Sequence, residues 1–310
     1  MTTDEQTQRA DADGGWKDVI EDFTEEFFEF YFPKVHAAID FTVSPRFLDT
    51  QLRELVVDAE AAGREADRLI EARLKDGTTE WLLVHVEVQG YPDPGFAERM
   101  FIYNYRIFDK YHRDVVSLAV LTDNDPSFRP SEYRREKLGC CQTFSFPIVK
   151  LIDYSTETLE DSDSVFALIT RVQLAYLEAR RDDRRRFDRK VALTHELVHS
   201  GYDHEKVLRV FRFLDFVMRL PKPLAIQYRQ KLESMEGELQ MPYVTSIERL
   251  AKEEGQLESR REDVIEALEI RFGDIPYTLC EAINHVSTES ELRKLHRLAI
   301  TVERLDKFTV

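Results

Sequence analysis

Residues 67–90, DRLIEARLKDGTTEWLLVHVEVQG, decide the fold that we expect for this chain. Two strand-like runs, Asp67–Leu74 and Trp81–Gln89, flank the segment KDGTT, whose Asp-Gly pair is a typical hairpin turn. In the second run the even positions are all apolar, whereas the odd positions become polar toward the end. Alternate side chains of a strand share a face, so Glu87 and Gln89 emerge together. The stretch therefore predicts an antiparallel hairpin with polar residues at one end.

The segments around this hairpin predict a mixed α/β domain. Trp16–Phe32 and residues 96–113 show helical apolar spacing, and Pro33 closes the first of these helices. Val115–Thr122 is apolar on both faces, as expected for a strand inside a sheet, and Phe144–Ile152 could add a further strand. From about residue 161 the pattern is helical only.

We therefore predict a disordered leader, an α/β domain and a helical remainder. The expected limits are 1–15 for the leader, 16–155 for the α/β domain, 156–240 for a helical extension and 241–310 for an all-helical C-terminal domain. In the last of these, Thr245-x-x-Glu248 and Thr288-x-x-Glu291 match capping boxes that open helices.

Composition excludes several classes of protein. The chain has 310 residues, of which 43% are hydrophobic and 33% charged, with no apolar run of the roughly 18–20 residues that span a membrane. Its first residues are polar and acidic, unlike a secretory signal. The three cysteines, with Cys140 and Cys141 adjacent, give no disulfide framework or zinc spacing, and we expect them to have packing roles. The sequence predicts a soluble, cytoplasmic protein without membrane contact.

The charge of the chain is acidic and unevenly distributed. The net charge is −16, whereas dedicated nucleic-acid binders usually carry a basic field. Residues 1–61 contain 5 basic and 15 acidic side chains, a balance of −10, and residues 171–231 contain 15 basic and 8 acidic ones, a balance of +7. Such a distribution can present a basic face, although solvated helix faces produce it more often.

The polar end of the hairpin suggests a site for a divalent cation. If the connecting loop has an odd number of residues, Asp67 lies directly opposite Glu87, with Cβ atoms about 5 Å apart. Two carboxylates at that distance repel each other unless a cation lies between them, and oxygen ligands suit Mg²⁺ or Mn²⁺. The alternative is a solvent-exposed strand end with ordinary polar residues.

The same residues resemble a known signature. Asp67, nineteen intervening residues and Glu87-Val88-Gln89 resemble the D…(D/E)-x-K motif of the PD-(D/E)XK nuclease superfamily, and more narrowly the Rpn group of recombination-promoting nucleases, or putative transposases. The resemblance extends through WKDVIEDFTEEFFEFYFP, FAERMFIYNYRIFDKY and VVSLAVLTD. It continues in LVHSGYDHEKVLRVFRFLDFVMRLP and in MPYVTSIERL…VIEALEIRFGDIP, which resembles a C-terminal domain of unknown function often attached to that group.

The resemblance implies a restriction-endonuclease-like core with a small mixed sheet, and metal-dependent hydrolysis of DNA by an endonuclease. Asp67, Glu87 and Gln89 would be the catalytic residues, and Asp67 and Glu87 would hold Mg²⁺ or Mn²⁺. Gln89 departs from the lysine of the superfamily pattern. It can donate hydrogen bonds but carries no charge and cannot act as a base.

The helix after the hairpin offers cations for the phosphates of DNA. Its candidate DNA-binding residues are Arg99, Tyr103, Arg106 and Lys110, which recur along one helical stripe. The alternative is a solvated face with Tyr103 partly packed. In the first helix, Glu25 or Glu26 could supply a further carboxylate.

A second motif matches zinc proteases. His195-Glu196-Leu197-Val198-His199 has the H-E-x-x-H spacing, but no third ligand follows in a recognised position. We expect two surface histidines that bind no zinc, with Gly201 as the left-handed residue that ends the helix.

Three functions therefore compete. Metal-dependent DNA cleavage comes first, and a non-catalytic DNA-associated or oligomerising scaffold with a decayed nuclease site comes second. In the scaffold the C-terminal helices could pair between copies of the chain, although Gly255 interrupts their apolar stripe. A zinc protease that uses His195 and His199 comes third.

Overall fold

The computed structural model describes residues 15–48, 67–77, 79–87, 93–239, 243–273, 275–284, 286, 288–302 and 304–308. Its contacts divide the chain into two units, Met1–Lys231 and Leu232–Val310. The first unit is mixed α/β, as predicted, and the described part of the second unit is helical. The domain limits expected from the sequence stay predictions.

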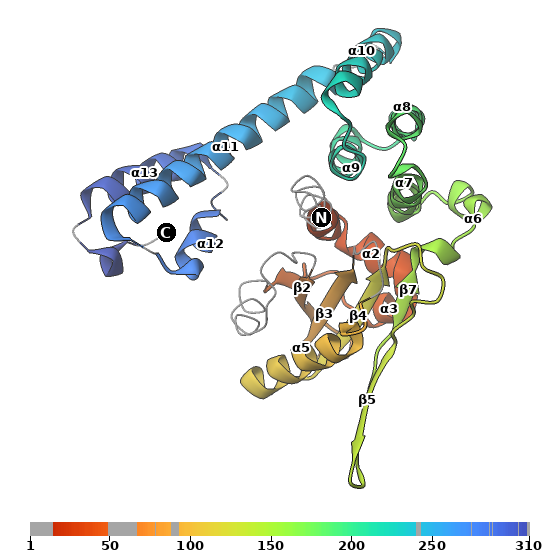
Figure 1. Ribbon diagram of the computed structural model, residues 1–310, viewed down its shortest axis with the longest axis vertical. Coiled ribbons are helices and arrows are strands. Elements are labelled where there is room, and N and C mark those ends of the chain that lie inside the picture. The colour runs from red at the N-terminus through yellow and green to blue at the C-terminus, as the bar shows by residue number, and fades with distance from the viewer. Residues whose placement is uncertain are drawn as a thin grey trace. The chain divides into compact units, whose positions relative to one another are not determined.

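A five-stranded sheet forms the centre of the first unit (Figure 1). Its strands lie in the order β1-β2-β3-β4-β7. The β1–β2 and β2–β3 pairs are antiparallel, and the β3–β4 and β4–β7 pairs are parallel. The predicted hairpin is thus confirmed as β2 and β3. The strands are β1 (Arg46–Phe47), β2 (Asp67–Arg73), β3 (Thr79–Glu87), β4 (Val115–Leu121) and β7 (Ile148–Lys150).

Helix α5 (Phe96–Tyr111) connects β3 to β4 and covers one face of the sheet (Figure 1). Leu69 of β2 packs against Tyr103 and Ile107 of this helix, and all three are buried. Both α5 and the buried strand β4 agree with the sequence prediction. The parallel β3–β4 pair requires such a crossover, because a tight turn cannot join parallel strands.

The opposite face of the sheet meets the N-terminal helices. Arg68, which alternates with Leu69 along β2, pairs with Glu21 of the helical residues 15–22 at 2.9 Å. The predicted single helix from Trp16 to Phe32 is wrong. It is interrupted at Phe23, next to Thr24, whose hydroxyl donates to the Ile20 and Glu21 carbonyls and so competes with the helix backbone. It continues as α2 (Thr24–Tyr31), and Pro33 starts α3 (Pro33–Ala38).

Two further helices of the first unit, α7 (Val165–Ala179) and α9 (His204–Val217), pack on this N-terminal segment. Phe27 and Phe166 meet edge to face with centroids 5.4 Å apart, and the Tyr31 and Thr170 hydroxyls lie 2.7 Å apart. Trp16 contacts Phe213 in the same way, at 5.3 Å. The helices α6 (Thr156–Glu160) and α8 (Asp183–Val198) pack on α7, and all four helices lie within the helical extension expected over residues 156–240.

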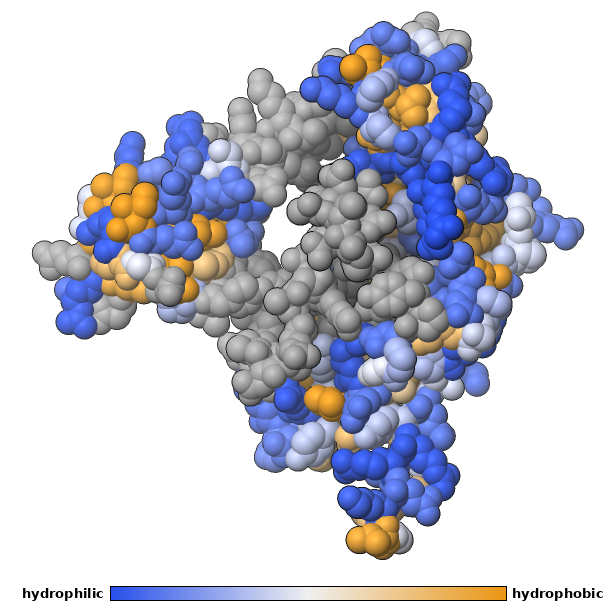
Figure 2. Space-filling view, in the orientation of Figure 1, coloured by the Kyte–Doolittle hydropathy of each residue, from blue (hydrophilic) through white to orange (hydrophobic). Residues whose placement is uncertain are grey.

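A two-stranded arm, which the sequence did not predict, projects from the first unit (Figure 1). It consists of β5 (Glu132–Lys137) and β6 (Cys140–Ser145). Figure 2 shows a hydrophobic end on this otherwise hydrophilic projection. Cys140 and Cys141 are exposed on it, so their predicted packing role is wrong.

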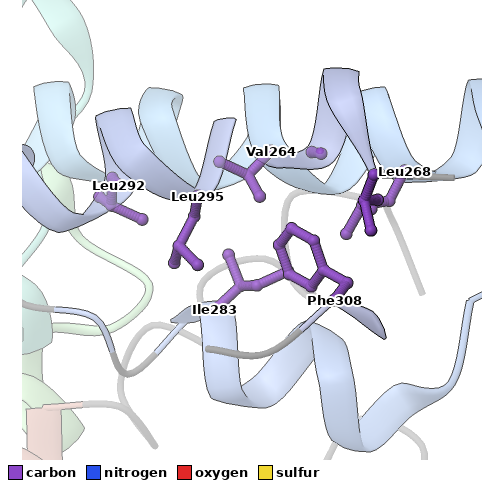
Figure 3. Packing of buried hydrophobic residues seen from close by; sticks show 8 residues of the cluster. Val264, Leu268, Ile283, Leu292, Leu295 and Phe308 are labelled. Carbon is purple, nitrogen blue, oxygen red and sulfur yellow. The ribbon is translucent and has the colours of Figure 1, made fainter. Parts of the chain in front are cut away.

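The second unit has its own apolar core, formed by α11, α12, α13 and the segment after them (Figure 3). Thr288 caps α13 as predicted, because its hydroxyl accepts from the Glu291 N–H and donates to the Glu291 carboxylate. Thr245 is not a cap, since α11 already begins at Tyr243. The elements are α10 (Lys222–Leu239), which crosses the boundary between the units, α11 (Tyr243–Phe272), α12 (Tyr277–Asn284), α13 (Glu289–Thr301) and the short helix Leu305–Lys307.

Candidate functional site

The carboxyl ends of three parallel strands meet at one edge of the sheet. Glu87 pairs with Leu121, and Leu121 pairs with Lys150, so the last residues of β3, β4 and β7 stand in one row. Asp67 begins β2 at the same edge, because β2 runs antiparallel to β3. Ligands of open α/β sheets bind outside the carboxyl ends of the strands. This edge is therefore the candidate site.

The structure corrects the register predicted for Asp67 and Glu87. Asp67 pairs with His85, and Glu87 lies two residues further along β3. The two residues still belong to the same face of the sheet, as diagonal neighbours on adjacent strands, and such neighbours lie about 7–8 Å apart. For both residues the structure describes the backbone, and their side chains lie outside the described part.

A contact from outside the hairpin accounts for this register. The ladder of the hairpin closes at Arg73 and Thr79, so the loop is odd, as predicted, but lies one residue earlier than expected. Leu74 forms a β-bridge with Ile39 instead of pairing within the hairpin. The chain then reverses at Gly77, whose φ of +89° favours glycine.

The start of α5 brings an ion pair to this edge. Gln89 lies outside the described residues, and the chain is described again from Asp93. One Asp93 carboxylate oxygen accepts from the Gly95 N–H at 2.9 Å, and the other pairs with Arg99 Nη1 at 2.5 Å. Asp93 thus closes the turn before the helix, whose N-cap is Gly95, and holds the guanidinium of Arg99, one of the candidate DNA-binding residues.

The predicted stripe of DNA-binding residues on α5 is not one exposed surface. Tyr103 is only 3% exposed and belongs to the core beneath the helix. Arg106 is half-buried, whereas Lys110 is exposed and lies over the Tyr111 ring. The structure therefore shows a packing role for Tyr103, and the contacts of this stripe with DNA stay predictions.

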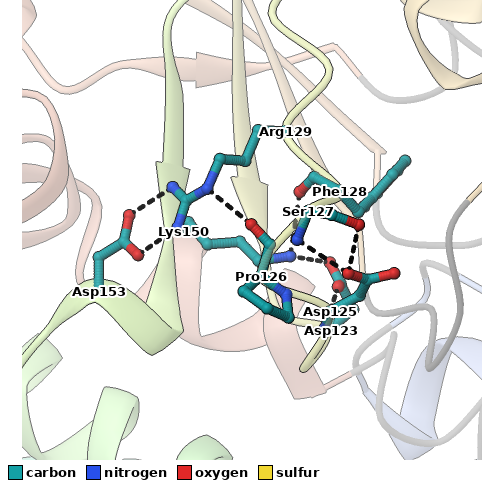
Figure 4. Close-up of polar contacts among 8 residues, drawn as sticks. All are labelled: Asp123, Asp125, Pro126, Ser127, Phe128, Arg129, Lys150 and Asp153. Carbon is teal, nitrogen blue, oxygen red and sulfur yellow. Dashed lines mark hydrogen bonds and ion pairs between the residues drawn. The ribbon is translucent and has the colours of Figure 1, made fainter.

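A buried ion pair, missed from the sequence, lies beside the candidate edge (Figure 4). Lys150 Nζ lies 2.5 Å from Asp123 Oδ2 and donates to the Phe128 carbonyl at 3.2 Å. Both charged side chains are 1% exposed. The other Asp123 oxygen accepts from the Asp125 N–H at 2.8 Å. This pair fixes the loop after β4 against the end of β7, and a polar residue just after a buried strand was the signal that could have revealed it.

Two further carboxylates lie near this ion pair (Figure 4). Asp125 accepts hydrogen bonds from the hydroxyl and N–H of Ser127, which lower the pKa of its carboxyl group. Arg129 forms a bidentate pair with Asp153 at 2.7 and 2.5 Å, and its hydrogen bonds lower the pKa of Asp153. These acids are therefore ionised in the neutral range.

Acidic side chains of residues 15–22 lie near the first residues of β2. Glu21 contacts Arg68, the neighbour of Asp67 in the chain. Asp18 keeps contact with solvent, but partial loss of hydration around its carboxyl group raises its pKa to about 6. The positive charge of Arg68 acts in the opposite direction. Burial likewise raises the pKa of Asp22.

The carboxylates that we considered from the sequence are directed elsewhere. Glu25 pairs with His36 at 3.4 Å, and Glu26 pairs with Lys206 at 3.5 Å. Glu21, one turn before the residues that we considered, is the acid that forms an ion pair with Arg68 of β2.

The H-E-x-x-H segment has a geometry unlike the protease motif. Helix α8 ends at Val198, and the Nδ1 atom of His199 donates to the His195 carbonyl at 2.6 Å. Glu196, which would be the general base of a zinc protease, forms a bidentate ion pair with Arg171. Gly201 has a φ of +76°, the left-handed conformation that we predicted at the helix end.

Arg171 and Glu196 line a small groove between α6, α7 and α8, with a volume of about 150 Å³. Its charged side chains pair with one another, since Arg171 also reaches Glu160 and Arg189 reaches Glu178.

Among the side chains that the structure describes, no three His, Cys, Asp or Glu residues gather into a metal-binding group. The side chains of Asp67 and Glu87 fall outside that search. No helix in the described part of the chain is both long and apolar enough to cross a bilayer. No protein-family model, curated protein or solved structure matches the chain.

Proposed function

We propose that this chain is a metal-dependent deoxyribonuclease that hydrolyses phosphodiester bonds of DNA at the carboxyl edge of its sheet. Its α/β unit would be a PD-(D/E)XK-like core, as the resemblance of the sequence suggests. The observation that supports this most is the β2–β3 register, which keeps Asp67 and Glu87 in phase at one edge.

The two acids suit a hard divalent cation. Carboxylate oxygens are preferred ligands of Mg²⁺, which usually takes one or two from the protein and the rest from water and phosphate. When bound, the cation would lower the pKa of a water molecule and neutralise charge on the phosphate. Asp67 and Glu87 would hold it at the strand ends, where DNA can approach.

Hydrolysis then requires few further groups. The oxygen of water forms a bond to phosphorus, the bond to the leaving oxygen breaks, and the leaving oxygen takes up a proton. Gln89 can donate a hydrogen bond to the phosphate or orient the water. The Arg99 guanidinium, held by Asp93, is the nearest described cation of α5 to this edge and could contact a phosphate.

A non-catalytic DNA-associated scaffold is the second candidate, and the neutral Gln89 favours it. The buried cation of the edge, Lys150, is engaged by Asp123 and so does not replace the missing lysine charge. The C-terminal helices could then serve assembly of identical chains.

Nicking of supercoiled plasmid with added Mg²⁺ or Mn²⁺ distinguishes these candidates. We expect Glu87→Ala to abolish nicking, because one lost electrostatic contact to a transition state already costs about 10²–10³ in rate. Gln89→Ala removes one neutral hydrogen bond, worth about 0.5–1.5 kcal/mol, and should slow nicking about tenfold at most. Gln89→Lys restores the charge of the superfamily pattern and should raise the rate.

Glu80→Ala is the matched control, because Glu80 lies at the opposite end of the same strand, paired with Ala72. It should leave the nicking rate unchanged, and circular dichroism should show that all variants fold. Equal nicking by the wild type and Glu87→Ala would refute the proposed site. A wild type that binds DNA without nicking it would favour the scaffold.

A further inference from the structure

The arm formed by β5 and β6 ends in an energetically unfavourable turn. Lys137 and Cys140 are the last paired residues, so Leu138 and Gly139 alone make the turn. Both have positive φ, +52° and +83°, as the two-residue hairpin turns with a right-handed twist require. Asn-Gly or Asp-Gly usually occupies such turns, whereas a leucine at positive φ is strained.

Leu138 is also fully exposed, at 100%. It is the most exposed large hydrophobic residue of the described chain, ahead of Ile270 at 77%. A strained and solvated leucine stabilises neither the turn nor the core. Strain of this kind in a folded protein points to a function of the strained residue.

The two faces of the arm differ in charge. Because alternate residues of a strand share a face, the register puts Arg135 and Lys137 on one side, which we call the basic face. The basic face consists of Tyr133, Arg135, Lys137, Cys140, Gln142 and Phe144, and no acidic residue of the arm belongs to it. The opposite face carries both acids of the arm, and its Arg134 pairs with Glu136 at 2.9 Å.

The base of the arm is anchored to α5 through aromatic contacts. The rings of Phe101 and Tyr133 stack with centroids 5.1 Å apart, and the Phe101 ring also meets Phe144 of β6. The Tyr133 hydroxyl donates to Glu98 at 3.2 Å. The arm is therefore tied to the helix that starts at the candidate site, while its tip extends into solvent (Figures 1 and 2).

We infer that the arm grips duplex DNA, with Leu138 inserted between base pairs and Arg135 and Lys137 on the phosphates. A two-stranded ribbon is an element that fits a DNA groove. Proteins that bend DNA insert an apolar side chain such as leucine between base steps. The two cations on one face complement the phosphates, although the net charge of the whole chain is −16. The inference rests on the proposed function only in taking DNA as the ligand.

Binding of the full chain to a short labelled duplex, measured by fluorescence anisotropy in EDTA, tests the arm without hydrolysis. A 2-aminopurine base in the duplex reports unstacking. Leu138→Asn should weaken binding about tenfold or more, because the burial of a leucine side chain between the base pairs is lost. It should also abolish the rise in 2-aminopurine emission that unstacking causes. The same variant should raise the melting temperature, because asparagine tolerates positive φ, so misfolding cannot explain its loss of binding.

Two matched controls isolate the arm. Ile270→Gln removes another exposed aliphatic side chain and should leave binding unchanged. Lys137→Gln should reduce the slope of log affinity against log salt by about 0.9, the value for one phosphate contact. Arg134→Gln, on the opposite face and already paired with Glu136, should leave that slope unchanged.

The outcomes separate this inference from the proposed function. If the wild type nicks DNA while Leu138→Asn binds the duplex as tightly as the wild type does, the arm inference is overturned and the nuclease stands. If binding depends on Leu138 but no nicking occurs, the nuclease is overturned and the arm inference stands. Absence of duplex binding overturns the arm inference. So does a Leu138-dependent binding of the chain to phosphatidylserine vesicles, measured in parallel, when the duplex is not bound.

Discussion

Replacing Asp123 by asparagine is expected to destabilise the first unit by about 3–5 kcal/mol, the usual cost of breaking a buried ion pair. The asparagine keeps the shape of the side chain and an oxygen for the Asp125 N–H, so the change removes mainly a charge. The ammonium of Lys150, 1% exposed, then lacks a counter-ion. Since whole domains are stable by about 5–15 kcal/mol, this is a large fraction of the total.

Urea unfolding followed by tryptophan fluorescence measures this change in the first unit alone. The chain has two tryptophans, Trp16 and Trp81, and both belong to Met1–Lys231. The matched control is Asp153→Asn, which breaks the bidentate pair with Arg129. Because those side chains are 41% and 50% exposed, the control should cost less than about 1 kcal/mol.

A double-mutant cycle completes the test. Lys150→Met alone leaves the Asp123 carboxylate buried and should also destabilise the unit, whereas the double variant removes both charges. Replacing a buried pair by uncharged side chains of similar volume is often neutral, so the double variant should lie within about 1 kcal/mol of the wild type. A double variant as unstable as the sum of the two single ones would refute this reasoning.

Three further changes have defined outcomes. Asp18→Asn should stabilise the first unit at pH 7 by less than about 1 kcal/mol and have no effect below about pH 4. The reason is that the raised pKa of about 6 makes the stability of the wild type fall as the pH rises from about 4 to 6. Urea unfolding at pH 4 and pH 7 measures the difference. Thr288→Ala should destabilise α13 by about 1 kcal/mol, which hydrogen exchange of that helix measures. Burial lowers the pKa of Lys190, so Lys190→Met should cost less stability in urea than Asp215→Asn, which leaves that ammonium buried without its partner.

The hairpin shows how far the sequence predicts the fold. Alternation of apolar and polar residues, with an Asp-Gly turn, predicted both strands and their phase correctly. The hairpin loop lies one residue earlier than expected, which shifts the pairing by two residues, so that His85 and not Glu87 lies opposite Asp67. The bridge between Leu74 and Ile39 joins residues far apart in the sequence, and local patterns carry no information on such a contact.

The arm and the buried ion pair were missed for related reasons. The Leu-Gly turn at Leu138 lacks the residues that usually mark a hairpin, and five of the six residues of β5 are charged, so no alternation of apolar and polar residues marks the strand. Lys150 and Asp123 are 27 positions apart and meet only because β4 and β7 pair. Lys150 is stabilised by a partner that is distant along the chain, and on our proposal the partner of Leu138 lies outside the protein, so neither residue is explained by its neighbours in the sequence.

The distribution of charge bears on where DNA could bind. Cations of the basic segment 171–231 pair with acids within the first unit: Arg209 with Asp22, Lys206 with Glu26, and Arg189 with Glu178. Two of these acids belong to the acidic residues 1–61, so the opposite balances of the two segments partly neutralise each other in the fold. Duplex bound through the two cations of the arm's basic face should give a slope of log affinity against log salt of about −2. A much steeper slope would require the ion pairs of residues 171–231 to open toward the phosphates, and would place the main DNA contact there instead of on the arm.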